Sequence, residues 1–304
     1  MTTIKAPSRT RLKRNQRIGL LLISPWLVGV ALFKLVPILA SMAIAFTDFY
    51  LLTPDEINFI GLENFRKLFQ DETVGFVFFQ SVAMVLYAIP FQLILTIGLA
   101  KLLSSPRIKG SNILRTLFFF PSIIPSVAIL SVMMGFLNPT TGWVNRLFFE
   151  PLGMETFNIF YDQAAGQILF IFNALWSIGP GLLIILGALQ GVPNDIHESA
   201  RVDGAGPFTR FFSLTLPMIS PAILFSLVIN LVMAFGGVIL LDRGNRFSGS
   251  ISPVDGYISY QIFERFNLGY AASLAWLFFV LIMAFIYLIF RTSNKWVFFP
   301  DREE

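Results

Sequence analysis

Side chains that could support catalysis are nearly absent from the apolar blocks of this sequence. The chain has 304 residues, 55% of them hydrophobic and 13% charged, with one histidine and no cysteine. His197 lies in a polar stretch, so a Ser-His-Asp centre or a His- or Cys-rich metal site cannot form within those blocks. The P-loop pattern, with its Gly-Lys dipeptide, does not occur. We therefore predict no catalytic residues, no metal, no bound cofactor and no ATP hydrolysis by this chain.

Uncharged polar residues are scattered through the apolar blocks instead. They can bond neighbouring helices, at about 0.6 kcal/mol each on average, or they can line a path for a solute. Asn173 and Trp176 are spaced i, i+3 and share a helix face. An amide beside an aromatic plane suits a sugar, which offers hydroxyls and an apolar ring face. The candidate path residues are Gln92, Asn173, Trp176, Ser177 and Asn230.

The apolar blocks are long enough to cross a bilayer. Soluble domains carry about 25% charged residues, almost twice the share found here. We predict an all-α integral membrane protein. Pro121 and Pro125 should kink the third span, and Gly179-Pro180-Gly181 should break the fourth. The six predicted spans are 18–46, 76–100, 116–137, 165–189, 218–241 and 270–290, with a polar loop from Asp242 to Gly269 before the last.

Basic residues divide unequally between the two sides of this topology. Fifteen lie with the two termini and the 194–217 segment, six lie on the other side, and Lys34 falls inside the first span. This asymmetry predicts that both termini are cytoplasmic, and it accounts for the net charge of +4 without nucleic acid. The predicted organisation is a basic tail (1–17), a six-span domain (18–291) and a cytoplasmic tail (292–304).

The polar segment 194–217 should form two short helices. Asn194 or Asp195 could cap the first helix, with Glu198 completing a capping box. Gly204 is placed to end it, and Pro207 to begin the second. An apolar face of the second helix is predicted from the spacing of Phe208, Phe211, Phe212 and Thr215.

The same segment resembles the EAA loop of permeases in binding-protein-dependent ABC importers. That pattern is E-A-A, three residues, G, nine residues and I-x-L-P. This sequence has Glu198-Ser199-Ala200, Gly204 and Leu214-Thr215-Leu216-Pro217 at matching spacings. The resemblance implies that an ATPase contacts Glu198, Ser199, Ala200, Asp203, Gly204 and Ala205.

The wider chain resembles carbohydrate-importer permeases of the maltose and glycerol-phosphate type. The familial stretches include Gly61-Leu62-Glu63-Asn64-Phe65 and Ala271-Ala272-Ser273-Leu274-Ala275-Trp276. Leu241-Asp242-Arg243-Gly244-Asn245-Arg246 departs from the T-x-G-G-P stretch common there. The resemblance implies a six-transmembrane-helix permease bundle with cytoplasmic coupling helices, in the inner membrane of a prokaryote. The implied partners are a second permease chain, which in such importers is often a different one, two cytoplasmic ABC ATPases carrying ATP-Mg, an external solute-binding protein and the lipid bilayer.

Two other classes of function remain open at this point. A secondary transporter or channel would work without an ATPase, but the spans after the first lack the ionisable relay that ion-coupled transporters use. A membrane enzyme is disfavoured because the spans lack His and carboxylates. The primary prediction is a permease subunit that imports a sugar, oligosaccharide or polyol.

Overall fold

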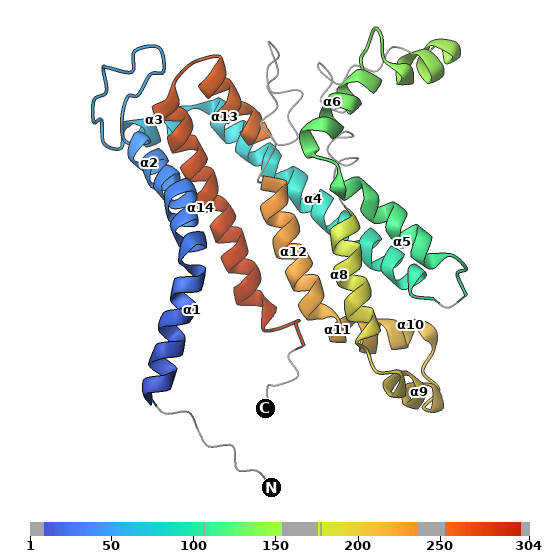
Figure 1. Cartoon of the computed structure of the whole chain (residues 1–304). Helices are drawn as coiled ribbons and strands as arrows, with labels where there is room; N and C mark the ends of the chain where they lie inside the picture. The colour runs from blue at the N-terminus through green and yellow to red at the C-terminus, as the bar shows by residue number, and fades with distance from the viewer. Residues whose placement is uncertain (1–8, 106, 154–175, 177, 236–252, 299–304) are drawn as a thin grey trace.

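The computed structural model describes residues 9–105, 107–153, 176, 178–235 and 253–298. Within these ranges the chain is helical, and β-structure is limited to two isolated bridges, Thr47 with Phe59 and Tyr50 with Asn267. The helices form an elongated bundle in which α3 and α13 lie at one end and α9 and α10 at the other (Figure 1). The prediction of an all-α protein is confirmed for the described residues.

The first span is one long helical rod at the edge of the bundle. It comprises α1 (Arg9–Val30), a π-helical turn η1 (Ala31–Leu35) and α2 (Val36–Ile44). Its apolar stretch, Ile18–Ile44, has no buried residue in its most hydrophobic window. Such a surface suits contact with lipid, because apolar side chains are as stable against hydrocarbon as they are inside a protein core. Lys34 is exposed within the π turn.

The second span is longer than predicted at both ends. After α3 (Glu63–Gln70), α4 runs from Glu72 to Leu103 with Pro90 inside it. The predicted limits of 76–100 missed the cap: the Asp71 carboxylate accepts a hydrogen bond from the Thr73 N–H at 2.9 Å. Asp71 thereby satisfies a free N–H of the first turn and allows the helix to begin earlier.

The predicted kink of the third span is confirmed. Helix α5 (Ser111–Phe119) passes into a 3₁₀ turn, η2 (Phe120–Ile123), and α6 (Ser126–Phe136) begins after Pro125. Both prolines therefore lie at the break between α5 and α6. The connector that follows contains two short turns, η3 (Asn145–Phe149) and η4 (Glu150–Leu152).

The expected break at Gly179-Pro180-Gly181 does not occur within α8 (Ile178–Gln190), which continues through all three residues. Gly179 has another role: a Cβ there would lie 2.8 Å from the Phe118 carbonyl oxygen. Its lack of a side chain lets α8 approach α5 closely.

The chain then passes through four short elements into the fifth span. These are α9 (Asn194–Val202), α10 (Pro207–Arg210), a π turn η5 (Phe211–Thr215) and α11 (Leu216–Met218). Helix α12 (Ser220–Phe235) follows after a bend of 66°.

The predicted polar loop from Asp242 to Gly269 contains a helix that the sequence reasoning missed. Helix α13 (Pro253–Phe263) packs against α4 and α14 (Leu268–Ser293). Its Val254 is fully buried, and its Tyr257 is buried too. The helix was missed because it is short and its apolar side chains are interrupted by polar residues and a glycine.

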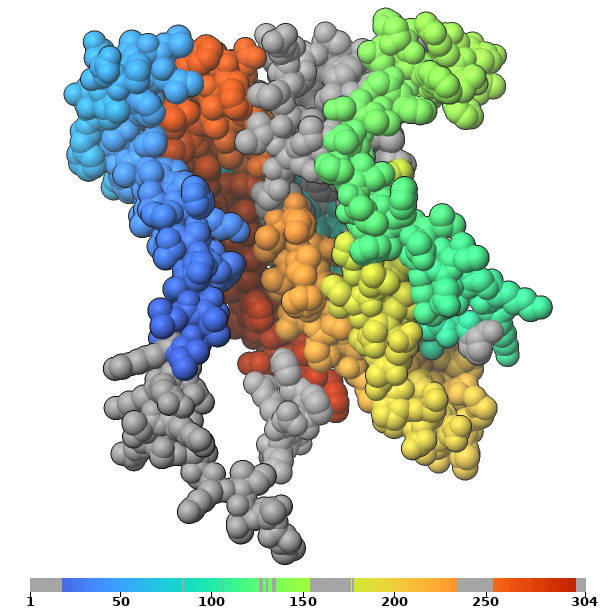
Figure 2. Space-filling model, viewed as in Figure 1, coloured from blue at the N-terminus to red at the C-terminus, as the bar shows by residue number. Residues whose placement is uncertain are grey.

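Two apolar clusters hold the bundle together. One joins α4 to α13 and α14, and includes Val77, Leu274 and Phe278. The other joins α4 to α8 and the start of α12, through Leu182, Ile185 and Ile219. Helix α4 contributes to both clusters and forms the common spine. In Figure 2, α1 and α6 lie at opposite sides of the view, with α12 between them.

Three described helices are long and apolar enough to cross a membrane: Ile18–Ile44, Glu72–Leu103 and Leu268–Ser293. The bent pair Pro207–Met218 and Ser220–Met233 makes a fourth if counted as one span. The predicted spans 165–189 and 218–241 lie partly outside the described residues. The described structure thus supports several apolar spans, while the count of six stays a prediction.

Candidate functional site

The segment 194–217 begins without the predicted side-chain cap. The N-cap of α9 is Pro193, in an extended conformation, and no side chain caps the helix. The prediction that Asn194 or Asp195 caps α9, with Glu198 in a capping box, is therefore wrong. Pro193 takes the N-cap position itself, so the helix begins at Asn194, two residues earlier than a cap at Asp195 would set it. Ser199 Oγ donates to the Asp195 carbonyl oxygen at 2.9 Å.

The end of α9 is the predicted glycine turn. Gly204 has φ of 80°, a left-handed conformation that residues with a Cβ adopt at a cost of about 1–2 kcal/mol. The Ala205 N–H donates to the Ala200 carbonyl oxygen at 2.9 Å, and the Gly204 N–H donates to the Arg201 carbonyl oxygen at 3.1 Å. This pair of bonds is a Schellman motif. The motif brings Ala200, Gly204 and Ala205 together in one tight turn.

The second piece of the segment is less regular than predicted. Pro207 begins α10, as expected, but a π turn follows from Phe211 to Thr215. The wider π turn rotates the residues after it, so the predicted face is divided. Thr215 is buried, whereas Phe208 and Phe212 are exposed. The four residues predicted to share one face therefore differ in exposure, and Thr215 alone among them is buried.

The carboxylates of this segment face solvent without an internal partner. Glu198 and Asp203 are exposed, and within the described residues neither side chain makes a hydrogen bond or ion pair. Apolar side chains are exposed beside them: Val202 is 88% exposed and Phe208 is 78% exposed. Outside a membrane, an apolar patch beside unpaired charges is typical of a surface that another protein covers.

Basic side chains flank the histidine of the same segment. Burial lowers the pKa of His197, and the positive charges of Lys101, Arg210 and Arg201 lower it further. The imidazole is therefore neutral at pH 7. The Lys101 ammonium, from the end of α4, lies 5.6 Å from the centre of the Phe211 ring, which joins the segment to α4.

The predicted path residues lie on helices that pack together. Gln92 is buried on α4, Asn230 is half-buried on α12, and Trp176 is half-buried just before α8. Helices α4, α8 and α12 pack against one another. Asn173 and Ser177 lie outside the described residues, so the shared face of Asn173 and Trp176 stays a prediction.

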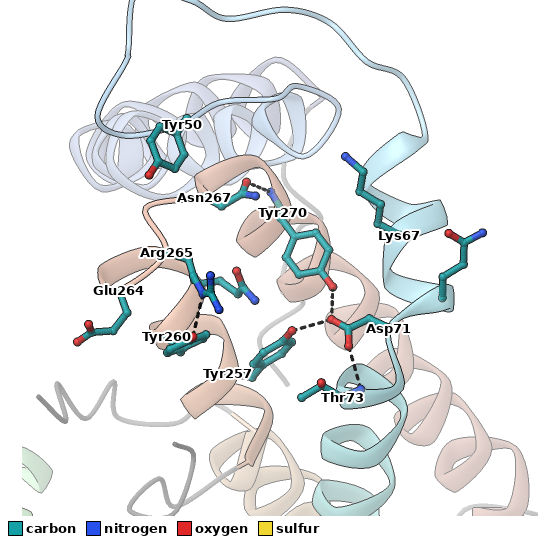
Figure 3. Close-up of a pocket in the computed structure, with 12 residues that line it drawn as sticks. Tyr50, Lys67, Asp71, Thr73, Tyr257, Tyr260, Glu264, Arg265, Asn267 and Tyr270 are labelled. Carbon is teal, nitrogen blue, oxygen red and sulfur yellow. Dashed lines mark hydrogen bonds between the residues drawn. The ribbon is translucent and has the colours of Figure 1, made fainter. Parts of the chain in front are cut away.

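A second polar cluster, at the opposite end of the bundle, was missed by the sequence reasoning. Asp71 Oδ2 accepts hydrogen bonds from Tyr257 Oη at 2.7 Å and Tyr270 Oη at 2.8 Å. Asp71 Oδ1 accepts the Thr73 N–H that caps α4. One carboxylate thus ties the ends of α4, α13 and α14 together (Figure 3). We call Asp71, Tyr257 and Tyr270 the tyrosine hub.

The tyrosine hub shifts the acidity of its members. Burial raises the pKa of Asp71, but the hydrogen bonds from Tyr257, Tyr270 and Thr73 outweigh it and the pKa is lowered overall. Burial, and then the bond to Asp71, raises the pKa of Tyr257 to about 12. At neutral pH the hub is one carboxylate held by neutral hydroxyl donors. The only signal in the sequence is Asp71 itself, which precedes the apolar run by three positions and would indicate no more than a helix cap.

The hub forms the floor of an open hollow of about 1030 Å³. Its walls come from the loop before α3, from α3 and the start of α4, and from α13 and the start of α14 (Figure 3). Among the described residues there is no group of three or more His, Asp or Glu side chains that could hold a metal. The lining residues are Tyr50, Lys67, Gln70, Asp71, Thr73, Tyr257, Tyr260, Gln261, Glu264, Arg265, Asn267 and Tyr270.

Comparison with protein families identifies the chain. Residues 92–298 match the family described as binding-protein-dependent transport system inner membrane component. The chain belongs to this family. The match includes α8 to α14, and with them the 194–217 segment. The permease is therefore an inner-membrane, multi-pass subunit of a binding-protein-dependent ABC importer, and it is not itself the ATPase.

The permease is similar to known proteins over almost its whole length. It is 30% identical to the probable ABC transporter permease protein YesP of Bacillus subtilis, with 96% of each chain covered. It is 26% identical to the trehalose/maltose transport system permease protein MalF of Thermococcus litoralis, covering 90% of this chain and 92% of that one. These likenesses confirm the predicted resemblance to carbohydrate-importer permeases.

The fold also matches a solved transporter. A chain of the bacterial alginate ABC transporter, in complex with its alginate pentasaccharide-bound periplasmic protein, superposes with a TM-score of 0.72. The match covers 94% of this chain and 96% of that chain, at 20% identity. The helical arrangement is therefore that of an ABC importer permease.

Proposed function

We propose that the permease forms part of the membrane path for a carbohydrate, delivered by an external binding protein and driven by separate ATPase subunits. The observation that carries the proposal is the near full-length similarity to permeases of named sugar systems. One relative serves trehalose and maltose and another, from Rhizobium radiobacter, serves lactose. The shared fold with the alginate transporter supports the same class of solute.

The α9–α11 segment is the surface that we assign to the ATPase. Glu198 and Asp203 offer carboxylates with no internal partner, and Val202 and Phe208 offer exposed apolar area. The Schellman turn at Gly204 gives the segment one fixed shape. Ser199, Ala200 and Ala205 are small enough for another surface to seat closely on the turn. Such a rigid element can transmit a push from the ATPase to α8 and α12.

Orientation follows from the same assignment. An ATPase that binds ATP-Mg works in the cytoplasm, so the α9 end is the cytoplasmic end and the α3/α13 end is external. The excess of basic residues on the side of the termini supports this orientation. Closure of two ATPases on ATP would draw together the α9 segments of this permease and of a second permease chain. The spans would then rock and open the path to the outside.

The solute path is assigned to the helices that pack around α4. Gln92 and Asn230 supply amides, and Trp176 supplies an aromatic plane. Asn173 and Ser177 belong to the same predicted path. Amides with an aromatic face suit the hydroxyls and the apolar face of a sugar ring.

The decisive experiment is co-purification of the permease with its partner subunits, followed by measurement of ATPase activity in liposomes. ATP hydrolysis should rise when the external binding protein and its carbohydrate are added. Glu198→Lys should abolish that rise because it reverses the charge of a side chain assigned to the ATPase contact. Gly204→Trp should abolish it because a large side chain would block close packing of the ATPase on the turn. Tyr287→Ala, on an exposed surface of α14, is the matched control. Unimpaired uptake in both variants, with no ATPase bound, would instead identify a secondary transporter or channel.

A further inference from the structure

The hollow above the tyrosine hub is built as one rigid unit. Besides the hub, the loop before α3 is bonded to the turn between α13 and α14. The Leu51 N–H donates to the Phe266 carbonyl oxygen at 2.8 Å, and the Gly269 N–H donates to the Phe49 carbonyl oxygen at 3.0 Å. Asn64 Nδ2 donates to the Thr47 carbonyl oxygen at 2.8 Å. Four segments distant in sequence thus hold their positions before any ligand arrives, as small-molecule sites commonly do.

Tyrosine rings and polar side chains share the walls of the hollow. The Tyr257 and Tyr260 rings are nearly parallel, at 13°, with centres 6.3 Å apart. Arg265 Nε donates to Tyr260 Oη at 2.8 Å and holds that ring in place. Lys67 and Glu264 add exposed charged groups to the lining (Figure 3). Gln70 adds an exposed amide. Fixed aromatic faces and free hydrogen-bonding groups therefore occur together.

The charges of the lining balance. Lys67 and Arg265 are positive, whereas Asp71 and Glu264 are negative. The carboxylate of Asp71 is already occupied by three donors. Such a site gives no net attraction to an ion and suits a neutral, hydroxyl-rich ligand with an apolar face. Its volume of about 1030 Å³ is at the upper end of small-molecule sites, which span ~300–1,000 Å³.

We propose that this hollow is a binding site for a neutral saccharide at the external end of the permease, separate from the path within the spans. This inference rests on the proposed function for its sidedness and for the class of ligand. A ring of the saccharide lies against the edge of the Tyr260 ring, beside the Arg265 guanidinium that lies 5.5 Å from the centre of that ring. Its hydroxyls bond to Gln70, Glu264 and Lys67. The site holds a saccharide near the external mouth of the path. Asp71 is a positioning residue that fixes the hydroxyls of Tyr257 and Tyr270.

The site is tested with the full-length permease in lipid nanodiscs, without ATPase or binding protein. Saturation-transfer NMR is recorded with trehalose, maltose, lactose and maltotriose. At least one should give a saturable signal. Tyr260→Ala should raise its half-saturation concentration about tenfold, which corresponds to ~1.4 kcal/mol. Tyr260→Phe keeps the ring and should bind within about twofold of the parent.

A matched control separates this effect from a general loss of structure. Tyr287→Ala removes an exposed tyrosine of α14 far along the helix from the hollow and should bind like the parent. Absence of a saturable signal with all four saccharides would overturn the proposal. So would equal binding by Tyr260→Ala, or competition by glycerol-3-phosphate but by no saccharide, which would indicate a lipid-headgroup site. The binding experiment contains no ATPase, so its result is independent of the ATPase assay that tests the proposed function.

Discussion

At the α9 end of the permease the carboxylates of Glu198 and Asp203 face solvent without an internal partner, whereas at the α3/α13 end the carboxylate of Asp71 accepts three hydrogen bonds. Val202 of α9 is 88% exposed and Val254 of α13 is fully buried, although α3 also carries exposed apolar side chains such as Phe69. The carboxylates of Glu198 and Asp203 leave their bonding capacity open, whereas that of Asp71 has used most of its own.

This difference indicates where the permease meets a large partner. Exposed apolar groups beside unpaired charges lie ready for a protein surface that covers them. A polar network whose members are satisfied internally rigidifies the structure around it. We therefore expect substitutions at the α9 end to impair coupling with little effect on stability. Substitutions at the tyrosine hub should chiefly reduce stability.

The largest effect should follow Gly204→Val. Gly204 has φ of 80°, and a β-branched residue is strongly disfavoured there. Solute-stimulated ATPase activity should fall tenfold or more, because a loss of ~1.4 kcal/mol in the free energy of contact with the ATPase weakens that contact tenfold. Gly206→Ala is the control, because Gly206 has φ of −67° and open space around its Cβ position. Equal solute-stimulated ATPase activity in the two variants would contradict the assignment of the Gly204 turn as the ATPase contact.

The next effect concerns the stability of the α3/α13 end. In Gly269→Ala the added Cβ would clash with the Thr47 carbonyl oxygen. The free energy of unfolding should fall by about 1–3 kcal/mol, measured as a lower Tm in detergent. Gly75→Ala in α4 has open space, and should raise stability by up to ~1 kcal/mol. A parental Tm for Gly269→Ala would show that this end is not rigid.

Acid should loosen the hub. The pKa of Asp71 lies below its ordinary value of 3.8 in the folded protein. The stabilisation is therefore complete above pH 3.8 and is lost as the pH falls through the lowered pKa. Asp71→Asn should remove that part of the acid dependence of Tm, worth ~1 kcal/mol after solvent screening. Asp203→Asn, at an exposed carboxylate without an internal partner, should leave the profile unchanged; the reverse pattern would refute the assignment.

The smallest effect is expected at His197. Burial and three nearby cations lower the pKa of His197, so any stability owed to the neutral imidazole is present above pH 6.5 and declines as the pH falls below it. Between pH 7 and 8, His197→Gln should change the stimulated ATPase rate by less than about twofold. A tenfold loss would show that the ring takes part directly in coupling.

The sequence predicted the α9 end better than the α3/α13 end. Gly204 and Pro207 act through local backbone geometry, which a glycine or a proline specifies by itself. The cap at Asn194 or Asp195 failed because Pro193 already fixes the entry to the helix. The face that includes Phe212 failed because a π turn changes the helical period.

The tyrosine hub could not be predicted from the sequence. Asp71 meets Tyr257 and Tyr270 across separations of 186 and 199 residues, and no local pattern joins them. The residues of α13 were predicted to form a polar loop, so the direction in which Tyr257 would point could not be predicted. The helical fold itself followed from the long apolar blocks, because hydrocarbon forces the backbone to bond internally.

The most direct test of this account compares the two ends by site-specific photo-crosslinking in the assembled transporter. One probe replaces Val202 in α9, and the other replaces Phe69 in α3, an apolar side chain that is 77% exposed. We predict that the Val202 probe crosslinks to an ATPase subunit and the Phe69 probe does not. A crosslink to the ATPase from position 69, or its absence from position 202, would contradict the central claim.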